Sequence, residues 1–177
     1  GEVVAVKGIG GYHLCANAAN PPVVAKIRQI KHRGQKPFAV LFRNIEEVRQ
    51  YCRVSQAEEK LLLSAARPIV LLHSKRPLPT EITCGSDRVG AFLPCNPLQI
   101  LLLEAISPLV ATSANISGAP MCTDDTAVQQ FGVPVLGHDR PILTPIDDSV
   151  LQVTEGNPAF MRRARGYVPL AVELPFA

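Results

Sequence analysis

The sequence has no tryptophan and few other aromatic residues, with three Tyr and six Phe among its 177 residues. It also has no apolar run near the ~20 residues that a membrane-spanning helix needs. Hydrophobic residues make up 47% of the chain and charged residues 19%, which is typical of a packed globular domain rather than of a disordered chain. We therefore expect one domain over residues 1–177, with an aliphatic core and no membrane partner.

The five cysteines include no C-x-x-C pair, which argues against a zinc site and against a disulfide framework. Free, buried thiols in a reducing cytosol are the expected state, so we predict a cytoplasmic protein. No secretory or transit leader precedes the first apolar segment. The chain opens on Gly1 rather than Met, which favours a segment excised from a longer multidomain protein over a processed N-terminus.

Charge is spread unevenly along the chain, although the formal net charge is only +3. Residues 1–80 carry 13 Lys and Arg against 5 Asp and Glu, whereas residues 81–177 carry 5 against 10. Between Lys26 and Arg43 there are six basic residues and no acid. A basic stretch beside an acidic remainder suits capture of a compact anion such as a nucleotide phosphate, and a solvated basic helix face is the alternative.

Hydrophobic periodicity and capping residues predict strands that alternate irregularly with helices. The predicted strands are residues 2–6, 38–42, 69–73, 89–92, 108–112, 149–153 and 159–163, and the predicted helices are 21–30, 45–52, 55–63, 96–105 and 123–132. Ser55 with Glu58 three residues later forms a capping box at the start of one helix. This order favours an α/β (α+β) fold with a twisted mixed sheet flanked by helices.

Three cations, Lys31, Arg33 and Lys36, follow the helix predicted over residues 21–30. In an extended or turn segment Lys31 and Arg33 are two residues apart and could point the same way. Arginine offers a planar fork to phosphate oxygens and lysine offers a point charge, so this spacing favours phosphate binding. Basic residues also stabilise helix C-termini, which is the structural alternative.

Hydroxyl and amide side chains follow the strand predicted over residues 108–112, in the order Thr112-Ser113-Ala114-Asn115. Ligands gather at the carboxyl ends of strands in α/β sheets. Thr112, Ser113 and Asn115 are therefore candidates for holding a nucleotide or a small polar substrate. A Ser/Asn turn that only closes the strand is the alternative.

The glycine-rich turn Lys7–Gly11 could let a ligand approach the backbone closely, with Tyr12 and His13 beside it. A dinucleotide-binding fingerprint is excluded, because His13 stands where the third glycine belongs. Near the other end of the chain, Asp147-Asp148-Ser149 could hold Mg²⁺ through water or orient an arginine. The basic run Arg162–Arg165 beside these acids could complete an anion pocket or be solvated.

Taken together, these segments resemble the paired signature of the YrdC-like family. The signature elements are Lys31-x-Arg33 with Lys36-Pro37 and, further along, Thr112-Ser113-Ala114-Asn115-x-Ser117-Gly118. The family includes threonylcarbamoyl-adenylate synthases of tRNA modification and a domain of HypF, which makes the carbamoyl group for the cyanide ligands of nickel–iron hydrogenases. The synthases carry Pro-Thr-x-Thr-x-Tyr-Gly-Leu after the first strand, whereas the Lys7–Leu14 segment here, KGIGGYHL, is similar to the HypF branch.

The resemblance implies a YrdC-like three-layer fold that joins carbamate and ATP into carbamoyl-adenylate and pyrophosphate. It implies that Mg²⁺ is bound mainly by the phosphates, with few protein ligands, and it assigns no residue as a metal ligand. Lys31 and Arg33 would bind the phosphates, and Ser113 and Asn115 would hold the nucleotide and the acyl group. The remaining residues that the resemblance places around ATP and the small substrate are Lys7, Thr112, Ser149 and, less firmly, Arg163.

The resemblance also implies partners. Carbamate derived from carbamoyl phosphate would come from acylphosphatase and zinc-finger parts of a parent chain, and the product would pass to a carbamoyl-transfer domain and a HypE-type acceptor. The isolated domain is then expected to bind ATP without completing transfer to a protein. Two alternatives stay open: a threonylcarbamoyl-adenylate synthase, and a non-catalytic module with weak double-stranded RNA binding, which requires a broad basic face.

Overall fold

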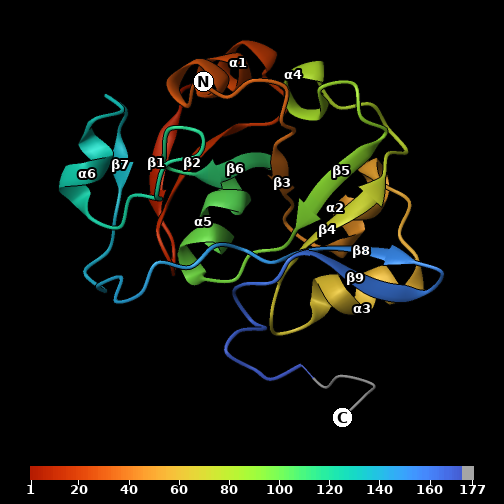
Figure 1. Ribbon diagram of the computed structural model, residues 1–177. Coiled ribbons are helices and arrows are strands. Elements are labelled where there is room, and N and C mark those ends of the chain that lie inside the picture. The colour runs from red at the N-terminus through yellow and green to blue at the C-terminus, as the bar shows by residue number, and fades with distance from the viewer. Residues whose placement is uncertain (173–177) are drawn as a thin grey trace.

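The apolar runs of the sequence form strands of one nine-stranded mixed sheet in a computed structural model that describes residues 1–172 (Figure 1). The end of the predicted domain, residues 173–177, lies outside this range. The strand order is β7-β1-β2-β6-β3-β5-β4-β8-β9. The strands are β1 Val4–Lys7, β2 Tyr12–Asn17, β3 Ala39–Leu41, β4 Ile69–His73, β5 Arg88–Phe92, β6 Leu109–Ser113, β7 Val135–Leu136, β8 Val150–Thr154 and β9 Asn157–Arg162.

The helices begin where the sequence supplies capping side chains. Asn44, Ser55, Asn96 and Asp124 each accept a hydrogen bond from a backbone N–H in the first turn, an arrangement that contributes about 1 kcal/mol per helix. The capping box of Ser55 and Glu58 is present as predicted. The helices are α1 Pro21–Ile30, α2 Ile45–Tyr51, α3 Gln56–Leu63, α4 Thr80–Thr83, α5 Pro97–Ala105 and α6 Asp125–Gln129.

The two faces of the sheet are covered to different extents. On one face the larger core cluster receives side chains from α1, α2, α3, α4 and α6, including Ile27, Val48 and Leu62. On the other face the smaller cluster receives helical side chains from α5 alone within residues 1–172, including the fully buried Leu103. Figure 1 shows α5 on the viewer's side of the sheet. The predicted three-layer α/β arrangement is confirmed, and the second face is left partly open beside α5.

Three short elements are absent from the sequence prediction. Strand β2 follows the glycine turn directly and pairs antiparallel with β1, and the Gly8 N–H donates to the Gly11 carbonyl at 2.9 Å. Its sequence, YHLCAN, has no β-branched residue, so its strand character comes from pairing on both sides. Helix α4 has four residues and β7 has two, which is too short for a periodic pattern. The helix predicted from Thr123 to Gly132 is shorter, because Asp124 provides its cap.

The cysteine side chains form no disulfide bonds. All five cysteines are free, with Cys15, Cys52 and Cys122 buried and Cys84 and Cys95 partly exposed. Burial raises the pKa of the Cys15 thiol to about 12. None of the helices within residues 1–172 is long and apolar enough to cross a membrane.

Candidate functional site

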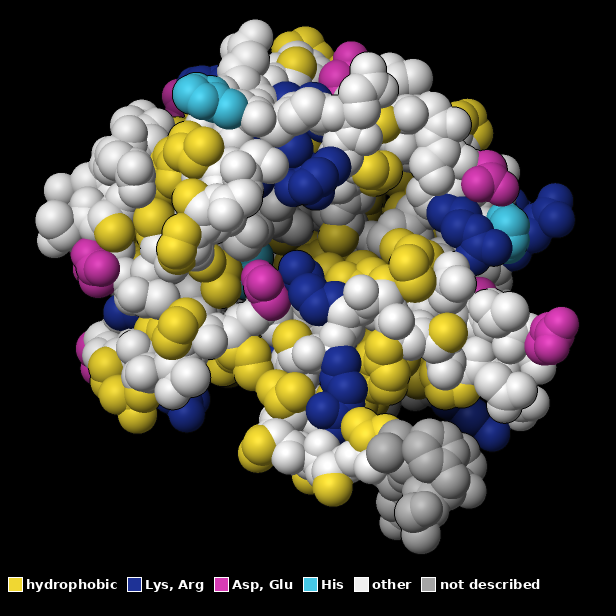
Figure 2. Space-filling model, in the orientation of Figure 1, with side chains coloured by type: hydrophobic (Ala, Val, Ile, Leu, Met, Phe, Trp, Pro, Cys, Tyr) yellow, Lys and Arg dark blue, Asp and Glu magenta, His cyan; other side chains and the backbone are white. Residues whose placement is uncertain are grey.

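A cavity of about 420 Å³ lies on the incompletely covered face of the sheet. Its floor is built by small and aliphatic side chains of the central strands, namely Ala39, Ile69, Leu71, Gly90 and Ala111. Figure 2 shows a hollow near the centre of this face, with apolar surface inside it and Lys or Arg side chains at its margin. An apolar floor with a polar rim is typical of a small-molecule site.

The cavity is deepest at the centre of the floor, where small residues face each other across two strands. Ala39 of β3 pairs with Gly90 of β5 in the parallel register. A Cβ atom on Gly90 would come within 3.1 Å of the Ile69 side chain and fill part of this space. The arrangement leaves room for a flat ring against the sheet.

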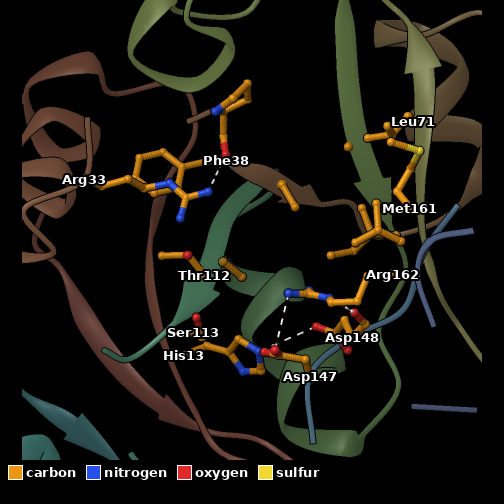
Figure 3. Close-up of a pocket in the computed structure, with 16 residues that line it drawn as sticks. His13, Arg33, Phe38, Leu71, Thr112, Ser113, Asp147, Asp148, Met161 and Arg162 are labelled. Atoms are coloured by element: carbon orange, nitrogen blue, oxygen red, sulfur yellow. Dashed lines mark hydrogen bonds and ion pairs between the residues drawn. The ribbon is translucent and has the colours of Figure 1, made fainter. Parts of the chain in front are cut away.

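Arg33 forms one wall of the cavity (Figure 3). Its guanidinium lies 5.0 Å from the centre of the Phe38 ring. It donates to the Lys36 carbonyl at 3.1 Å and to the Pro37 carbonyl at 2.8 Å. Burial, together with the neighbouring Arg28, lowers the pKa of Arg33. These contacts use two of its five N–H groups, so a fixed fork remains available to an anion.

Lys31 is fully buried and lies behind the cavity rather than on its surface. Its ammonium donates to the Ser113 carbonyl, to the Asn115 carbonyl at 2.9 Å and to Asn115 Oδ1 at 2.7 Å. Burial and the nearby Arg33 lower the pKa of Lys31 to about 8. The structure therefore brings Lys31, Ser113 and Asn115 together. All three ammonium hydrogens are used within the protein, so Lys31 positions the Ser113–Asn115 segment.

The hydroxyls of the Thr112–Ser117 segment face two adjoining cavities. Thr112 and Ser113 line the first cavity, while Ser113, Asn115 and Ser117 line a second cavity of about 400 Å³. Ser113 Oγ donates to Asn115 Oδ1 at 2.8 Å, and Asn115 Nδ2 donates to the Ala119 carbonyl at 2.6 Å. Together the two cavities offer an apolar compartment joined to a polar one.

The adjacent carboxylates of Asp147 and Asp148 each pair with an arginine side chain. Asp147 lies 3.3 Å from Arg162, and Asp148 accepts from Arg165 at 2.6 and 3.0 Å. Burial of the Asp148 carboxyl opposes its ionisation, but His13 and Arg165 outweigh this effect and hold the pKa of Asp148 below its usual range. Among residues 1–172 no group of three or more His, Cys, Asp or Glu side chains could hold a metal ion.

Arg162 is a site residue that the sequence reasoning did not select. It lines both cavities, and Figure 3 shows it across the cavity from Arg33. The neighbouring Arg163, which the resemblance favours, donates instead to the Leu170 carbonyl and lines neither cavity. Nothing in the run Arg162–Arg165 distinguishes these side chains, because their directions depend on how the β8–β9 hairpin folds back.

Two further candidates, Lys7 and Ser149, line neither cavity. Lys7 is buried, donates to the His138 carbonyl at 2.9 Å and lies 4.0 Å from Asp125. Ser149 is also buried; its hydroxyl donates to the Arg165 carbonyl at 3.0 Å and accepts from the Ala164 N–H at 2.8 Å. In this geometry both residues stabilise the walls of the site rather than contact a ligand.

Comparison with known proteins gives matches along nearly the whole chain. The model of the Sua5/YciO/YrdC family, described as telomere recombination, matches residues 1–164. The carbamoyltransferase HypF of Synechocystis sp. is 44% identical over 182 residues, which cover 99% of this chain and 24% of that protein. The carbamoyltransferase HypF of Rhizobium leguminosarum is 45% identical, covering 98% and 25%. The chain thus spans about a quarter of the length of these relatives.

A solved structure shows the same similarity to HypF, and a second group of sequence relatives matches at lower identity. A crystal structure of full-length HypF in a phosphate- and nucleotide-bound form superposes with a TM-score of 0.91 and 45% identity, covering 95% of this chain and 28% of that one. The threonylcarbamoyl-AMP synthase of Bacillus subtilis is a more distant match, 32% identical over 69% of this chain and 37% of its own length.

Proposed function

Because this chain belongs to the Sua5/YciO/YrdC family, we propose that it binds ATP in the two adjoining cavities and joins carbamate to its α-phosphate. The products are carbamoyl-adenylate and pyrophosphate. One observation carries the proposal: an apolar floor in the sheet lies between two guanidiniums, Arg33 and Arg162, on opposite walls. The floor suits an adenine ring, and the guanidiniums suit phosphate oxygens.

The reaction needs positioning and charge neutralisation more than a protein nucleophile. A carbamate oxygen attacks the α-phosphorus, the bond between that phosphorus and the bridging oxygen breaks, and pyrophosphate leaves with the electron pair. Three cations, Arg33, Lys36 and Arg162, line the two cavities against the carboxylates of Asp147 and Asp148, so the walls carry a net positive charge. Mg²⁺ on the phosphates supplies further neutralisation. Fixed charges of this kind stabilise the transition state without reorganisation.

The polar compartment suits the acyl group. Ser113 and Asn115 present hydroxyl and amide groups there, and the buried ammonium of Lys31 fixes their backbone. In this arrangement Asn115 Nδ2 keeps one N–H for an oxygen of carbamate, and Ser113 Oγ can accept from its amino group. Lys31 therefore contributes by holding these groups in place rather than by touching the phosphates.

Similarity to one segment of full-length HypF supports a role for this chain within a longer protein. We propose that it is one domain of a longer cytoplasmic hydrogenase-maturation carbamoyltransferase. Its carbamate would derive from carbamoyl phosphate through an acylphosphatase domain and zinc-finger segments. Its adenylate would pass to a carbamoyl-transfer domain and then to a HypE-type acceptor. The higher identity to HypF than to threonylcarbamoyl-AMP synthase favours carbamate over threonylcarbamate as the acid.

Calorimetric titration of ATP with Mg²⁺ into this chain tests the proposal. Arg33→Ala and Arg162→Ala should each weaken binding by about 1.5–3 kcal/mol, roughly ten-fold or more, because each removes a charge-assisted contact. Arg49→Ala is the matched control, since Arg49 lies on α2 and its pairing with Glu59 at 2.7 Å is exposed. Failure of the wild type to bind, or an equal loss in the control, would contradict an ATP site in this cavity.

The RNA-binding alternative can be measured on the same samples. Binding of double-stranded RNA driven by phosphate contacts falls steeply as salt rises. If this chain bound such RNA with that salt dependence and did not bind ATP, the non-catalytic alternative would replace the adenylate-forming function.

A further inference from the structure

His13 stands at the end of the cavity where the two compartments meet. In the antiparallel register of β2 and β6, His13 lies opposite Ser113, so both side chains project from the same face of the sheet. Its side chain is 16% exposed and lines the first cavity together with Asp147 and Arg162. Figure 3 shows these groups gathered at one end, away from Arg33 and Phe38. The function proposed above gives no role to His13.

The ring of His13 is fixed on two sides. A Cβ atom on Gly8 would come within 3.0 Å of His13 Nδ1 and 3.1 Å of Cε1, so the glycine turn packs directly against the ring. On the other side Nε2 faces Asp148 Oδ2 at 3.6 Å. A side chain held between a turn and a carboxylate has little freedom to choose another rotamer.

Asp148 is itself held away from the ring. Its Oδ1 accepts two hydrogen bonds from Arg165, and Arg165 donates in turn to the carbonyls of Ala66 at 3.0 Å and Arg67 at 3.1 Å. The separation of 3.6 Å between His13 Nε2 and Asp148 Oδ2 exceeds a normal hydrogen-bond length. Because this contact is longer than a full hydrogen bond, an Nε2–H that faces Asp148 can be shared with a ligand oxygen in the cavity that both residues line.

The glycine turn next to His13 is closely packed. A Cβ atom on Gly10 or Gly11 would fall well inside van der Waals contact with Ile146 and Met121, so these side chains close tightly over the glycine turn. Both Ile146 and Met121 also line the second cavity. The turn next to His13 is therefore held in place by two residues of the second cavity.

We propose that His13 binds the carboxylate of the small acid through Nε2–H, and that Asp148 is the positioning residue that keeps this N–H aimed into the cavity. The inference rests on the proposed adenylate-forming function and adds the acid-binding group to it. The acid is a small planar oxyanion of the carbamate class, whose second oxygen contacts His13 while the first attacks phosphorus. Arg33, at the other end of the cavity, serves ATP instead.

Three variants separate these roles. His13→Leu removes the donor at similar size, His13→Gln restores an N–H donor at similar reach, and Asp148→Asn keeps the shape of the positioning residue without its charge. ATP affinity is measured by calorimetry for each variant. Pyrophosphate release is measured with ATP, Mg²⁺ and ammonium carbamate freshly dissolved at varied concentration.

We expect His13→Leu to leave ATP affinity within about two-fold while raising the KM for the acid about ten-fold, the size of one lost hydrogen bond to a charged group. His13→Gln should recover part of that loss, and Asp148→Asn should raise the same KM with little change in KM for ATP. Unchanged acid dependence in His13→Leu, in a variant that still binds ATP, overturns the role of His13 alone. A wild type that binds no ATP, or releases no pyrophosphate with the acid, overturns the proposed function together with it.

Discussion

At the scale of single residues, Lys31 is the group whose environment departs furthest from its apparent role in the sequence. Its position in the basic segment suggests direct contact with phosphate, yet its side chain is fully buried and satisfies three acceptors of the Ser113–Asn115 segment. A buried cation with a complete set of partners acts as a cross-link between α1 and the end of β6.

Replacing Lys31 with Met tests this structural role. The change leaves three acceptors without their donor and should lower the free energy of unfolding by about 1–3 kcal/mol. In the folded protein the pKa of Lys31 is about 8, against 10.5 for a free lysine. Between these values the unfolded state binds more protons, so the Lys31 contribution to stability rises with pH over that range. Urea denaturation should therefore show the wild-type advantage over Lys31→Met growing from pH 8 to pH 10.5, and a constant difference would contradict the lowered pKa.

Arg162 and Arg163 give a second comparison between neighbouring residues. Arg162 lines both cavities and pairs with Asp147, whereas Arg163 donates to the Leu170 carbonyl. We expect Arg162→Ala to weaken ATP binding at least about ten-fold more than Arg163→Ala, because only the first removes a charge facing the cavity. Calorimetry on the two variants measures this difference, and the reverse order would restore the assignment favoured by the resemblance.

At the scale of elements, the glycine turn between β1 and β2 lets the backbone pack closely against the segment that contains Ile146. Gly10 leaves no space for a Cβ atom against the backbone and side chain of Ile146, directly before Asp147 and Asp148. Gly10→Ala should therefore displace the acid pair, lower the free energy of unfolding by about 1–3 kcal/mol and weaken ATP binding.

Gly34→Ala is the control for this change, because no atom lies within 4 Å of a Cβ atom built there. Thermal unfolding of both variants gives the comparison. Equal midpoints for Gly10→Ala and the wild type would show that the turn and the Ile146 segment do not need this contact.

The elements differ in how far the sequence could predict them. Helices α2, α3 and α5 were accessible because Asn44, Ser55 and Asn96 cap them and apolar residues follow at helical spacing. Strand β7 was not, because its two residues are defined only by parallel pairing with β1. Local pattern singled out Arg33, Ser113 and Asn115, which line the cavities, and Lys31, which is buried next to them. Arg162 and the approach of His13 to Asp148 were not found in this way, since they depend on sheet register and on the path of the β8–β9 hairpin.

At the scale of the whole molecule, the chain corresponds to about a quarter of the HypF proteins that it resembles. We expect it to bind ATP but to transfer no carbamoyl group to a HypE-type acceptor, because the proposed function assigns that transfer to other domains of a longer protein. Mass spectrometry of the acceptor after incubation with the chain, ATP, Mg²⁺ and carbamoyl phosphate measures transfer. Full-length HypF of Synechocystis sp. serves as the positive control, and carbamoylation by this chain alone would disprove the expectation.

On the sheet face that α5 covers only in part, the same side chains belong to the hydrophobic core and to the candidate site. Ile69 and Ala111 belong to the smaller core cluster and at the same time form the cavity floor. A planar ring bound there would cover apolar side chains that α5 leaves exposed, as a further helix of the third layer would do. The choice of ligand then follows the rules of a core substitution, in which a change of one methylene group in volume already has a cost.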